Sequence, residues 1–363
     1  MGLCMVDSSA PDYGQRADMS TTPSVRRRLV LLRERMLASA AMIFARLLPD
    51  LKPDSKNLKG RTAIVTGANT GIGYSLALQL AEMGALVILA CRNEQKALQA
   101  KKSMLESCHE ANIEIMSLDT ASLESVRNFA QQWEHGEVDF LFHNAGILAC
   151  PPGQDFTADN FELVYQTNFL GPFLLTYLLQ SHLRTTARVI LTSSFASYTG
   201  HIGDHFPLVK TQGKIEQKFH TLSIDPSGRV DPSRYNQTKH VQTLFARRLQ
   251  QHFACHNGGH RMAFSFHPGL VKTNVLEVPD RPTWRDPFYR ILPMMMSLVG
   301  IGQSQGAATG VHLATSDAPQ VLENRGRFFH RMKARPNRAD FVSQEELDKL
   351  WMRWCADLDI AWP

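Results

Sequence analysis

The sequence has few of the features that mark secreted, metal-binding or membrane-spanning proteins. Among 363 residues there are six cysteines, at 4, 91, 108, 150, 255 and 355, without a C-x-x-C pair or another metal-ligand spacing. This argues against a disulfide framework and favours a reducing, intracellular compartment. The fourteen histidines do not cluster with other ligand types, so no metal site is expected.

The chain also lacks a surplus of charge outside one short stretch. Between Ser24 and Arg46 there is a single acid, Glu34, and six arginines, at 26, 27, 28, 33, 35 and 46. This stretch alone therefore carries +5, which equals the whole formal net charge of the protein. The balanced remainder argues against a nucleic-acid-binding catalytic domain.

The same stretch has no apolar run long enough to cross a bilayer. Its longest uncharged run, Met36–Ala45, has ten residues, whereas a spanning helix needs about 20. We predict that residues 24–48 form an arginine-rich amphipathic helix that lies peripherally in a membrane interface, after a disordered leader at 1–20. The alternatives are a transit-peptide-like targeting segment, or a helix that packs on the core. The expected location is intracellular, cytoplasmic or peripherally membrane-associated, with the endoplasmic reticulum and mitochondria as alternatives.

Apolar β-like runs alternate with helical stretches along the rest of the chain. With 44% hydrophobic residues, the chain can bury one large core, so one domain with extensions fits better than two equal domains. The alternation predicts an α/β fold with a parallel sheet covered on both faces. We divide the chain into an N-terminal extension (1–57), a main domain (58–335) and a C-terminal part (336–363). Within the last part, Ser343–Leu358 is typical of a capped amphipathic helix.

A glycine-rich turn, Thr66-Gly-Ala-Asn-Thr-Gly-Ile-Gly73, follows an apolar strand at Thr62–Val65. Gly67 allows a tight turn, Gly71 lets the backbone approach a pyrophosphate, and Gly73 lets the next helix pack on the sheet. The helix N-terminus adds partial positive charge for the phosphates. The turn predicts a nucleotide site, with a ligand-free strand-to-helix turn as the alternative.

A tyrosine and a lysine lie four residues apart further along, in Tyr235-Asn-Gln-Thr-Lys239. This spacing puts both side chains on one face of a helix, with the ammonium near the phenol. A phenol, with its ordinary pKa of about 10, exchanges protons poorly at neutral pH unless a cation favours its ionised form. Downstream of a nucleotide-binding turn, the pair predicts the acid–base unit of a carbonyl/alcohol oxidoreductase.

Six motifs, in this order and approximate spacing, resemble the short-chain dehydrogenase/reductases. They are the glycine turn at 66–73, Asn144-Ala-Gly146, Asn168, Ser193-Ser194, Tyr235-x-x-x-Lys239 and Pro268-Gly269. Within the family, the group of retinol dehydrogenases and the WW-domain oxidoreductase is the most similar. The segments that carry this likeness are Ala90-Cys-Arg-Asn93, Phe173-Leu-Leu-Thr176, His267-Pro-Gly and Gly326-Arg-Phe-Phe329. His143 stands where the family usually has a second asparagine, and no WW domain is expected before Trp133, the first tryptophan.

The resemblance implies a single doubly wound Rossmann-type domain with a small C-terminal substrate lid. It implies four catalytic residues, Asn168, Ser194, Tyr235 and Lys239, of which Ser194 orients the substrate oxygen and Asn168 holds a water beside the lysine. It also implies a set that binds the dinucleotide: Gly67, Asn69, Thr70, Gly71, Ile72, Gly73, Arg92, Asp119, Asn144, Ala145, Gly146, Tyr235, Lys239, Pro268, Gly269 and Thr273. In that set Asp119 contacts the adenine, and Thr273 helps to hold the carboxamide and phosphates.

The charge after the second strand indicates which nicotinamide cofactor is bound. NAD enzymes usually place a carboxylate about 20 residues past the glycines, on the ribose 2′-hydroxyl. Here that strand is Ala85–Ala90, and Cys91 and Arg92 follow it. No carboxylate is there to repel a 2′-phosphate, and a guanidinium can pair with one. We predict NADP(H); the alternative is that Arg92 is a solvated loop residue.

These interpretations combine into an NADP(H)-dependent oxidoreductase that interconverts a carbonyl and an alcohol. By resemblance the substrate is lipophilic, of retinoid, steroid or aldehyde type. The alternatives are a reductase dedicated to a secondary-metabolite pathway, a non-catalytic NADP(H)-binding scaffold, and a nucleotide-sugar epimerase or dehydratase. The oligomeric state stays open, with a homodimer as the candidate.

Two further segments and one cysteine are candidates for substrate contact. A polar insertion at about 203–232 is expected to form a loop beside the pocket. The apolar, methionine-rich Pro282–Ile301 predicts a lid or a membrane contact, or plain core packing. Cys150 either lines the site or is a small buried residue.

Overall fold

The computed structural model of the chain describes residues 23–151, 153–200, 202, 210–211, 214–215, 233–272 and 299–363. Several predictions fall outside these residues. They concern the leader at 1–20, the site residue Thr273, most of the 203–232 insertion and nearly all of Pro282–Ile301.

The centre of the molecule is a sheet of eight described strands in the order β10-β9-β8-β5-β4-β1-β2-β3. All neighbours pair in parallel except β10, which is antiparallel to β9 at one edge. The bounds are β1 (Thr62–Thr66), β2 (Leu86–Cys91), β3 (Asn112–Ser117), β4 (Val138–His143), β5 (Leu183–Thr192), β8 (Met262–His267), β9 (Phe328–His330) and β10 (Lys333–Arg335). Two short strands, β6 (Lys210–Thr211) and β7 (Lys214–Ile215), form a separate antiparallel pair.

The strand order reverses between β1 and β4, and this fixes where a ligand can bind. From β1 the chain proceeds outward through β2 to β3, and it then returns to β4 on the other side of β1. Connections leave the carboxyl ends of β1 and β4 in opposite directions, which opens a crevice above the sheet at that point. The glycine turn after β1 lies at this crevice.

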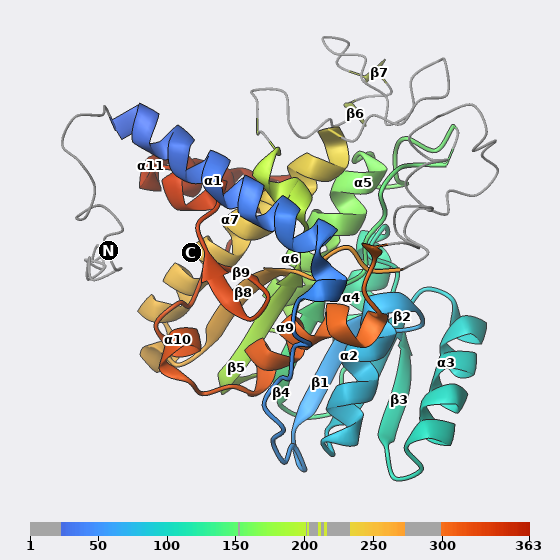
Figure 1. Cartoon of the computed structure of the whole chain (residues 1–363). Helices are drawn as coiled ribbons and strands as arrows, with labels where there is room; N and C mark the ends of the chain where they lie inside the picture. The colour runs from blue at the N-terminus through green and yellow to red at the C-terminus, as the bar shows by residue number, and fades with distance from the viewer. Residues whose placement is uncertain are drawn as a thin grey trace.

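Helices cover both faces of the sheet, as Figure 1 shows. One apolar core joins the sheet to α2, α3 and α9 and includes Leu76, Leu80 and Val311. A second core joins the opposite face to α4, α6, α7 and α11 and includes Phe173, Phe245 and Trp354. Because both faces are covered, every residue of β1 and of β4 is buried, which explains why most of their residues are apolar. The predicted doubly wound α/β fold is confirmed.

The helices have the following bounds. They are α2 (Gly71–Glu82), α3 (Glu94–Ser107), α4 (Leu123–Gln131), α5 (Leu163–Tyr165), α6 (Gly171–Leu178), α7 (Ser233–Cys255), α9 (Gln303–Thr315), α10 (Pro319–Leu322) and α11 (Gln344–Asp357). The prediction of a capped helix at Ser343–Leu358 is confirmed, because Ser343 and Glu346 form a reciprocal capping box at the start of α11.

The N-terminal stretch forms a long helix, α1 (Pro23–Ile43), followed by one turn, η1 (Ala45–Leu47). In Figure 1, α1 lies along the outside of the body. Ala38 packs against Tyr198 and Phe328, and the buried Glu34 pairs with Arg335 at 3.8 Å. Among the described helices, none combines the length and apolar character needed to cross a membrane.

Candidate active site

A cavity of about 640 Å³ lies at the crevice between β1 and β4 and extends to the N-terminal part of α7. Fifteen of the predicted site residues line it: Gly67, Asn69, Thr70, Gly71, Ile72, Arg92, Asp119, Asn144, Ala145, Gly146, Ser194, Tyr235, Lys239, Pro268 and Gly269. Gly73 and Asn168 do not line the cavity themselves, but they contact residues that do. The tertiary structure therefore gathers segments from β1, β2, β4, β5, α7 and β8 around one space.

The glycine turn is held open by backbone conformations that glycine favours. Gly67 and Gly71 have φ of +65° and +63°, in the left-handed region where other residues are strained. A Cβ atom on Gly73 would clash with the Gly67 carbonyl oxygen and with the side-chain amide of Asn144. The turn therefore keeps the first residues of α2 close to β4 and leaves bare backbone along the cavity.

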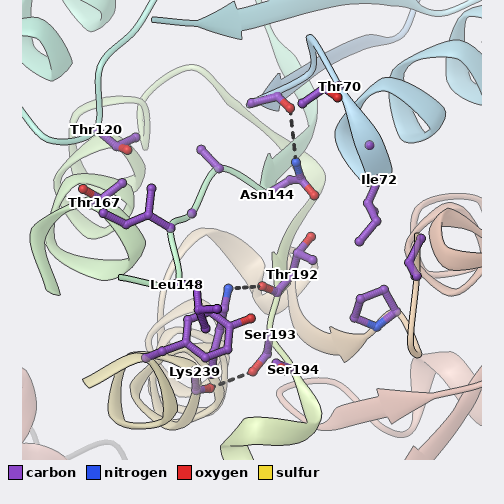
Figure 2. Close-up of a pocket in the computed structure, with 18 of the residues that line it drawn as sticks. Thr70, Ile72, Thr120, Asn144, Leu148, Thr167, Thr192, Ser193, Ser194 and Lys239 are labelled. Atoms are coloured by element: carbon purple, nitrogen blue, oxygen red, sulfur yellow. Dashed lines mark hydrogen bonds between the residues drawn. The ribbon is translucent and has the colours of Figure 1, made fainter. Parts of the chain in front are cut away.

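Thr66 and Asn144 tie the glycine turn to the end of β4. The Thr66 hydroxyl accepts hydrogen bonds from the amides of Asn144 (2.9 Å) and Ala145 (3.0 Å). In return the Asn144 side chain donates to the carbonyls of Thr66 (3.1 Å) and Gly67 (3.4 Å), and Figure 2 shows Asn144 beside the glycine turn. Our sequence reasoning missed this role of Thr66, although its place directly before Gly67 was a signal. The preceding His143 is a neutral core residue, because full burial lowers its pKa to about 3.

Tyr235 and Lys239 lie one turn apart near the start of α7, and the lysine ammonium is 5.4 Å from the centre of the tyrosine ring. The ammonium donates to the Thr192 carbonyl at 2.8 Å and to Gln242 Oε1 at 3.2 Å. Burial lowers the pKa of Lys239 to about 7. Burial also raises the pKa of Tyr235, and a hydrogen bond with Ser194 partly offsets this. In the protein alone, desolvation thus outweighs the effect of the neighbouring cation on the phenol.

The two adjacent serines have different environments. The Ser193 hydroxyl is buried and donates to the main-chain carbonyl of Lys239 at 2.7 Å, so it fastens β5 to α7. Ser194 is only half-buried and caps a short turn, η3 (Phe195–Tyr198), by accepting from the Ala196 amide at 3.2 Å. Its hydroxyl also bonds to Tyr235. Of the pair, Ser194 is therefore the one whose hydroxyl meets Tyr235.

Asn168 lies in an irregular turn within a helical stretch that runs from Leu163 to Leu178. Residues Gln166–Leu170 form a π-helical turn, η2, between α5 and α6. Such turns are rare and frequently occur at functional sites. Here the turn directs the Asn168 side chain at the chain beyond β4. Its Oδ1 accepts from the Ile147 amide at 2.8 Å, and its Nδ2 donates to the Ile147 carbonyl at 2.9 Å and to Thr238 Oγ1 at 3.1 Å.

Gln242 connects Lys239 to Asn168, and the sequence reasoning missed it. While Gln242 Oε1 accepts from the lysine ammonium, its Nε2 donates to the main-chain carbonyl of Asn168 at 2.7 Å. The side chain is fully buried. The side-chain amide thus links the Lys239 ammonium to the main chain at Asn168. The available signal was a polar residue three positions after Lys239, on the same buried helix face.

The opposite end of the cavity carries exposed positive charge. The Arg92 side chain is 73% exposed, and its nearest acid is Asp119, at 3.9 Å. Lys96, which the sequence reasoning missed, also lines this end; its position four residues after Arg92, in the first turn of α3, was the signal. Cys91 is buried, and desolvation raises the pKa of its thiol to about 11. No carboxylate therefore occupies this position.

His267 joins the Ser194 turn to the Pro268-Gly269 turn, and this role was also missed. Its Nδ1 accepts from the amides of Phe195 (3.1 Å) and Gly269 (3.4 Å). Its Nε2 lies 3.3 Å from the sulfur of Met42, which belongs to α1. Burial holds the pKa of His267 well below its usual range, so the ring is neutral and Nδ1 remains an acceptor.

Cys150 is fully buried and donates to Glu162 Oε1 at 3.6 Å. It is not among the residues that line the cavity, so it is the small buried residue of the two alternatives. In the part of the chain that the structure describes, no group of three or more histidine, cysteine, aspartate or glutamate side chains could hold a metal ion.

The shape and chemistry of the cavity fit a nicotinamide dinucleotide. Its volume of about 640 Å³ lies within the range of about 300–1,000 Å³ that is common for cofactor pockets. A Cβ at Gly73 would clash with Gly67 and Asn144, so glycine is needed there for the start of α2 to pack against the turn and the end of β4. Cations at one end and the Tyr235–Lys239 pair at the other are separated by bare backbone, in the order that the adenosine ribose, the pyrophosphate and the reactive ring of a dinucleotide require.

Comparisons with known proteins agree with this geometry. The family model for short chain dehydrogenases matches residues 61–204. Human retinol dehydrogenase 13 is 31% identical over 309 residues, which are 82% of this chain and 85% of that protein. Dehydrogenase/reductase SDR family member 13 of Bos taurus is 35% identical over 281 residues, or 75% of this chain. The matched part is 66% of that relative, so the chain spans slightly less than two thirds of its length.

Solved structures show the same architecture. An uncharacterised protein from Mycobacterium paratuberculosis superposes with a TM-score of 0.61 at 26% identity, over 85% of this chain and 97% of that chain. A short chain dehydrogenase from Burkholderia cenocepacia, solved in complex with NADP, has a TM-score of 0.55 at 19% identity. That likeness covers 76% of this chain and 97% of the other, and it concerns the fold alone.

Proposed function

The chain belongs to the short-chain dehydrogenase family, in the retinol dehydrogenase-like group, and we propose that it interconverts a carbonyl and an alcohol with NADP(H). One observation carries the proposal. Tyr235, Lys239 and Ser194 converge at one end of a cavity whose other end holds the glycine turn. This combination supports an acid–base group facing a dinucleotide, and the names of the relatives, among them retinol dehydrogenases, support an alcohol as one of the reactants.

The catalytic side chains suit proton transfer to a reduced carbonyl. A bound nicotinamide would supply the hydride to the carbonyl carbon. The Tyr235 hydroxyl then gives its proton to the oxygen, which becomes the alcohol, and Ser194 holds that oxygen by a hydrogen bond. The charge on the oxygen develops only in the transition state, so donors already in place stabilise it selectively. Alcohol oxidation uses the same residues in reverse.

Lys239 supports the tyrosine in both directions. Its ammonium lies close to the phenol and favours the tyrosinate that remains after proton transfer. Because burial lowers its pKa to about 7, it can also give up a proton near neutral pH and so help to restore Tyr235. Gln242 and the Thr192 carbonyl fix its position, and Asn168 fixes Gln242 in turn.

The charges at the far end support NADP(H) over NAD(H). Arg92 and Lys96 both line the cavity there, and the adjacent position is the apolar thiol of Cys91 and not a carboxylate. A 2′-phosphate gains charge-assisted hydrogen bonds from such cations, whereas a 2′-hydroxyl gains little. Asp119 lies beside Arg92, which supports a contact between Asp119 and the adenine.

A lipophilic substrate agrees with the wall near the catalytic residues. Beyond Tyr235 and Ser194 this wall includes Leu148, Leu270 and Val271, which offer apolar surface and no charge. Such a mixture is typical of pockets that take a largely apolar ligand with one polar group.

Turnover of NADPH with lipophilic carbonyls tests the proposal. Purified protein is mixed with NADPH or NADH and with retinal, a 3-ketosteroid, medium-chain alkanals or a quinone, and the absorbance of the reduced cofactor is followed. NADPH consumption that Tyr235→Phe abolishes is the expected result. Binding of NADPH without turnover of any carbonyl would instead favour a cofactor-binding scaffold, and a preference for NADH would refute the 2′-phosphate argument.

A further inference from the structure

The N-terminal helix α1 packs directly on the turn that carries Ser194. Glu34, Ala38 and Met42 are spaced four residues apart and therefore share one face of α1. Through this inner face α1 contacts η3, the short turn that Ser194 caps. Ser194 also lines the active-site cavity. The same turn therefore takes part in the wall of the cavity and in the contact with α1.

Ala38 lies in a small apolar cluster behind η3. It is buried and packs against Tyr198 of η3 and Phe328 of β9. The ring of Phe195, the first residue of η3, is centred 5.7 Å from the ring of Tyr198 and packs against the same cluster. Side chains from both ends of η3 are therefore held against the inner face of α1.

Met42 reaches η3 through His267. The Met42 sulfur lies 3.3 Å from His267 Nε2, and His267 Nδ1 accepts from the amide of Phe195 at 3.1 Å. Phe195 directly follows Ser194. Because Nδ1 is an acceptor, the proton of the neutral ring is on Nε2 and faces the sulfur. Met42 thus provides the acceptor for the tautomer in which His267 can hold the Ser194 turn.

Contacts away from η3 also hold the N-terminal extension in place. Glu34 is buried and pairs with Arg335 of β10 at 3.8 Å. Beyond η1, the Leu51 amide donates to Gln305 Oε1 at 2.7 Å, and Gln305 Nε2 donates back to the Leu51 carbonyl at 3.2 Å. Gln305 belongs to α9, which packs on α2. Because the extension is fastened at β10 and at α9, a single substitution on its inner face should leave it attached.

We propose that α1 is a brace that holds the Ser194 turn in its catalytic position, and that Met42 and His267 are the positioning residues that transmit this contact. The inference rests on the proposed function, in which Ser194 holds the reacting oxygen. A misplacement of about 1 Å in such a group can lower a rate about 100-fold. Turnover should therefore depend on the inner face of α1. Cofactor binding should not, because it uses the glycine turn and Arg92.

Kinetics of Met42→Ala test the brace, with Met36→Ala as the matched control. Both variants of the full-length protein lose a methionine side chain from α1, but Met36 is 64% exposed. Met42→Ala leaves the His267 ring without its sulfur neighbour. It should lower kcat for NADPH-dependent carbonyl reduction about fivefold while the Kd for NADPH changes by less than about twofold. Met36→Ala should match the wild type in both quantities.

Hydrogen exchange at the Phe195 amide tests the brace without any substrate. His267→Leu removes the acceptor of this amide and should raise its exchange rate about tenfold. His267→Asn offers a side-chain oxygen in place of Nδ1 and should restore most of the protection. Met42→Ala should raise the rate about threefold, and Met36→Ala should leave it unchanged. Amides of β1 report global unfolding, so the ratio of the two rates separates local loosening from a general loss of stability.

Three results would overturn the brace. The first is an exchange rate at Phe195 that neither Met42→Ala nor His267→Leu raises. The second is equal acceleration at Phe195 and in β1, which would mean that α1 only stabilises the fold. The third is an equal loss of kcat in Met42→Ala and Met36→Ala. A wild-type protein that reduces no carbonyl would instead contradict the proposed function, and exchange at Phe195 would still show whether α1 holds the Ser194 turn.

Discussion

The two ends of the active-site cavity are built in different ways. At the catalytic end, Lys239 and Gln242 are buried, and each is held by two hydrogen bonds with partners in β5, η2 or α7. At the far end, Arg92 is largely exposed and has one loose ion pair, at 3.9 Å. The catalytic end is fixed by packing before any ligand arrives, whereas the far end presents an exposed cation to a ligand.

This difference indicates how each end contributes to function. Buried donors need no reorganisation during the reaction and act at low dielectric, where electrostatic effects are large. Exposed cations are screened by salt and contribute modestly to binding. We therefore expect large losses of rate from small changes at the catalytic end, and modest, salt-dependent losses of affinity from changes at the far end.

The largest effect is expected from Tyr235→Phe. Removal of the hydroxyl deletes the proton donor, and we expect kcat to fall about 10³-fold, within the usual contribution of acid–base catalysis. NADPH binding, followed by fluorescence, should be nearly unchanged because the hydroxyl faces the substrate oxygen. Tyr177→Phe, which removes a hydroxyl from α6, is the control and should keep the wild-type rate. Wild-type turnover by Tyr235→Phe would refute the catalytic assignment.

Gln242→Leu is expected to have the next largest effect. It removes an acceptor from the Lys239 ammonium and a donor from the Asn168 carbonyl. Hydrogen bonds to charged groups contribute about 1.5–3 kcal/mol, so we predict that kcat falls roughly 10- to 100-fold.

The ratio of the effects on kcat and KM distinguishes positioning of the lysine from general damage by Gln242→Leu. KM for the carbonyl should change little, because Gln242 contacts the lysine and not the cavity wall near the substrate. Gln251→Leu, on the same helix but paired with Gln344 at the surface, is the matched control. If both variants lost activity equally, the link from Lys239 through Gln242 to Asn168 would not be what positions the lysine.

Arg92→Asp should produce a smaller change that is specific to one cofactor. Replacement of a cation by an anion beside a 2′-phosphate is expected to weaken NADPH binding about tenfold, while NADH binding changes little. The difference should shrink as ionic strength rises, because the site is exposed. Arg127→Asp, on neighbouring α4, controls for the change in net charge. Equal loss of NADPH and NADH affinity would contradict a contact with the 2′-phosphate.

The smallest expected effect is a pH-dependent change in stability from Lys239. Burial lowers its pKa from 10.5 to about 7 in the folded protein, so between these values the unfolded chain binds more protons and the wild type gains stability as pH rises. Relative to the wild type, Lys239→Met should therefore become less stable by about 1 kcal/mol per pH unit in the window from about 7.5 to 8.5. Denaturant unfolding of the protein without cofactor measures this, with Lys102→Met as the exposed control. A difference that does not vary with pH would place the lysine in a better solvated environment.

Much of the fold and of the site's position followed from local sequence patterns. The turn at 66–73 and the strand before it were predictable because glycine's freedom at Gly67 and Gly71 is a property of single residues. The capped helix after Ser343 was predictable for the same reason. Motif order then placed the site between β1 and β4.

The residues that escaped prediction act through partners far away in the sequence. Gln242 matters because it meets Asn168, and His267 matters because its ring accepts from Phe195 and touches Met42. The π-helical turn around Asn168 was missed because a helical pattern of side chains does not reveal one extra residue in a turn. The prediction of an amphipathic helix at residues 24–48 did not state which face of the helix packs on the rest of the protein.

The sequence by itself determined the alternation of strands and helices, the glycine turn, the family and the types of residue available for catalysis. These depend on local conformational preference and on the order of motifs. Only the tertiary structure decided that the Ser193 hydroxyl bonds to the main chain of Lys239 while the Ser194 hydroxyl bonds to Tyr235, that burial lowers the pKa of Lys239, and that α1 turns one apolar face inward and another outward. Those outcomes depend on desolvation and on contacts between distant segments, which exist only after the chain has packed.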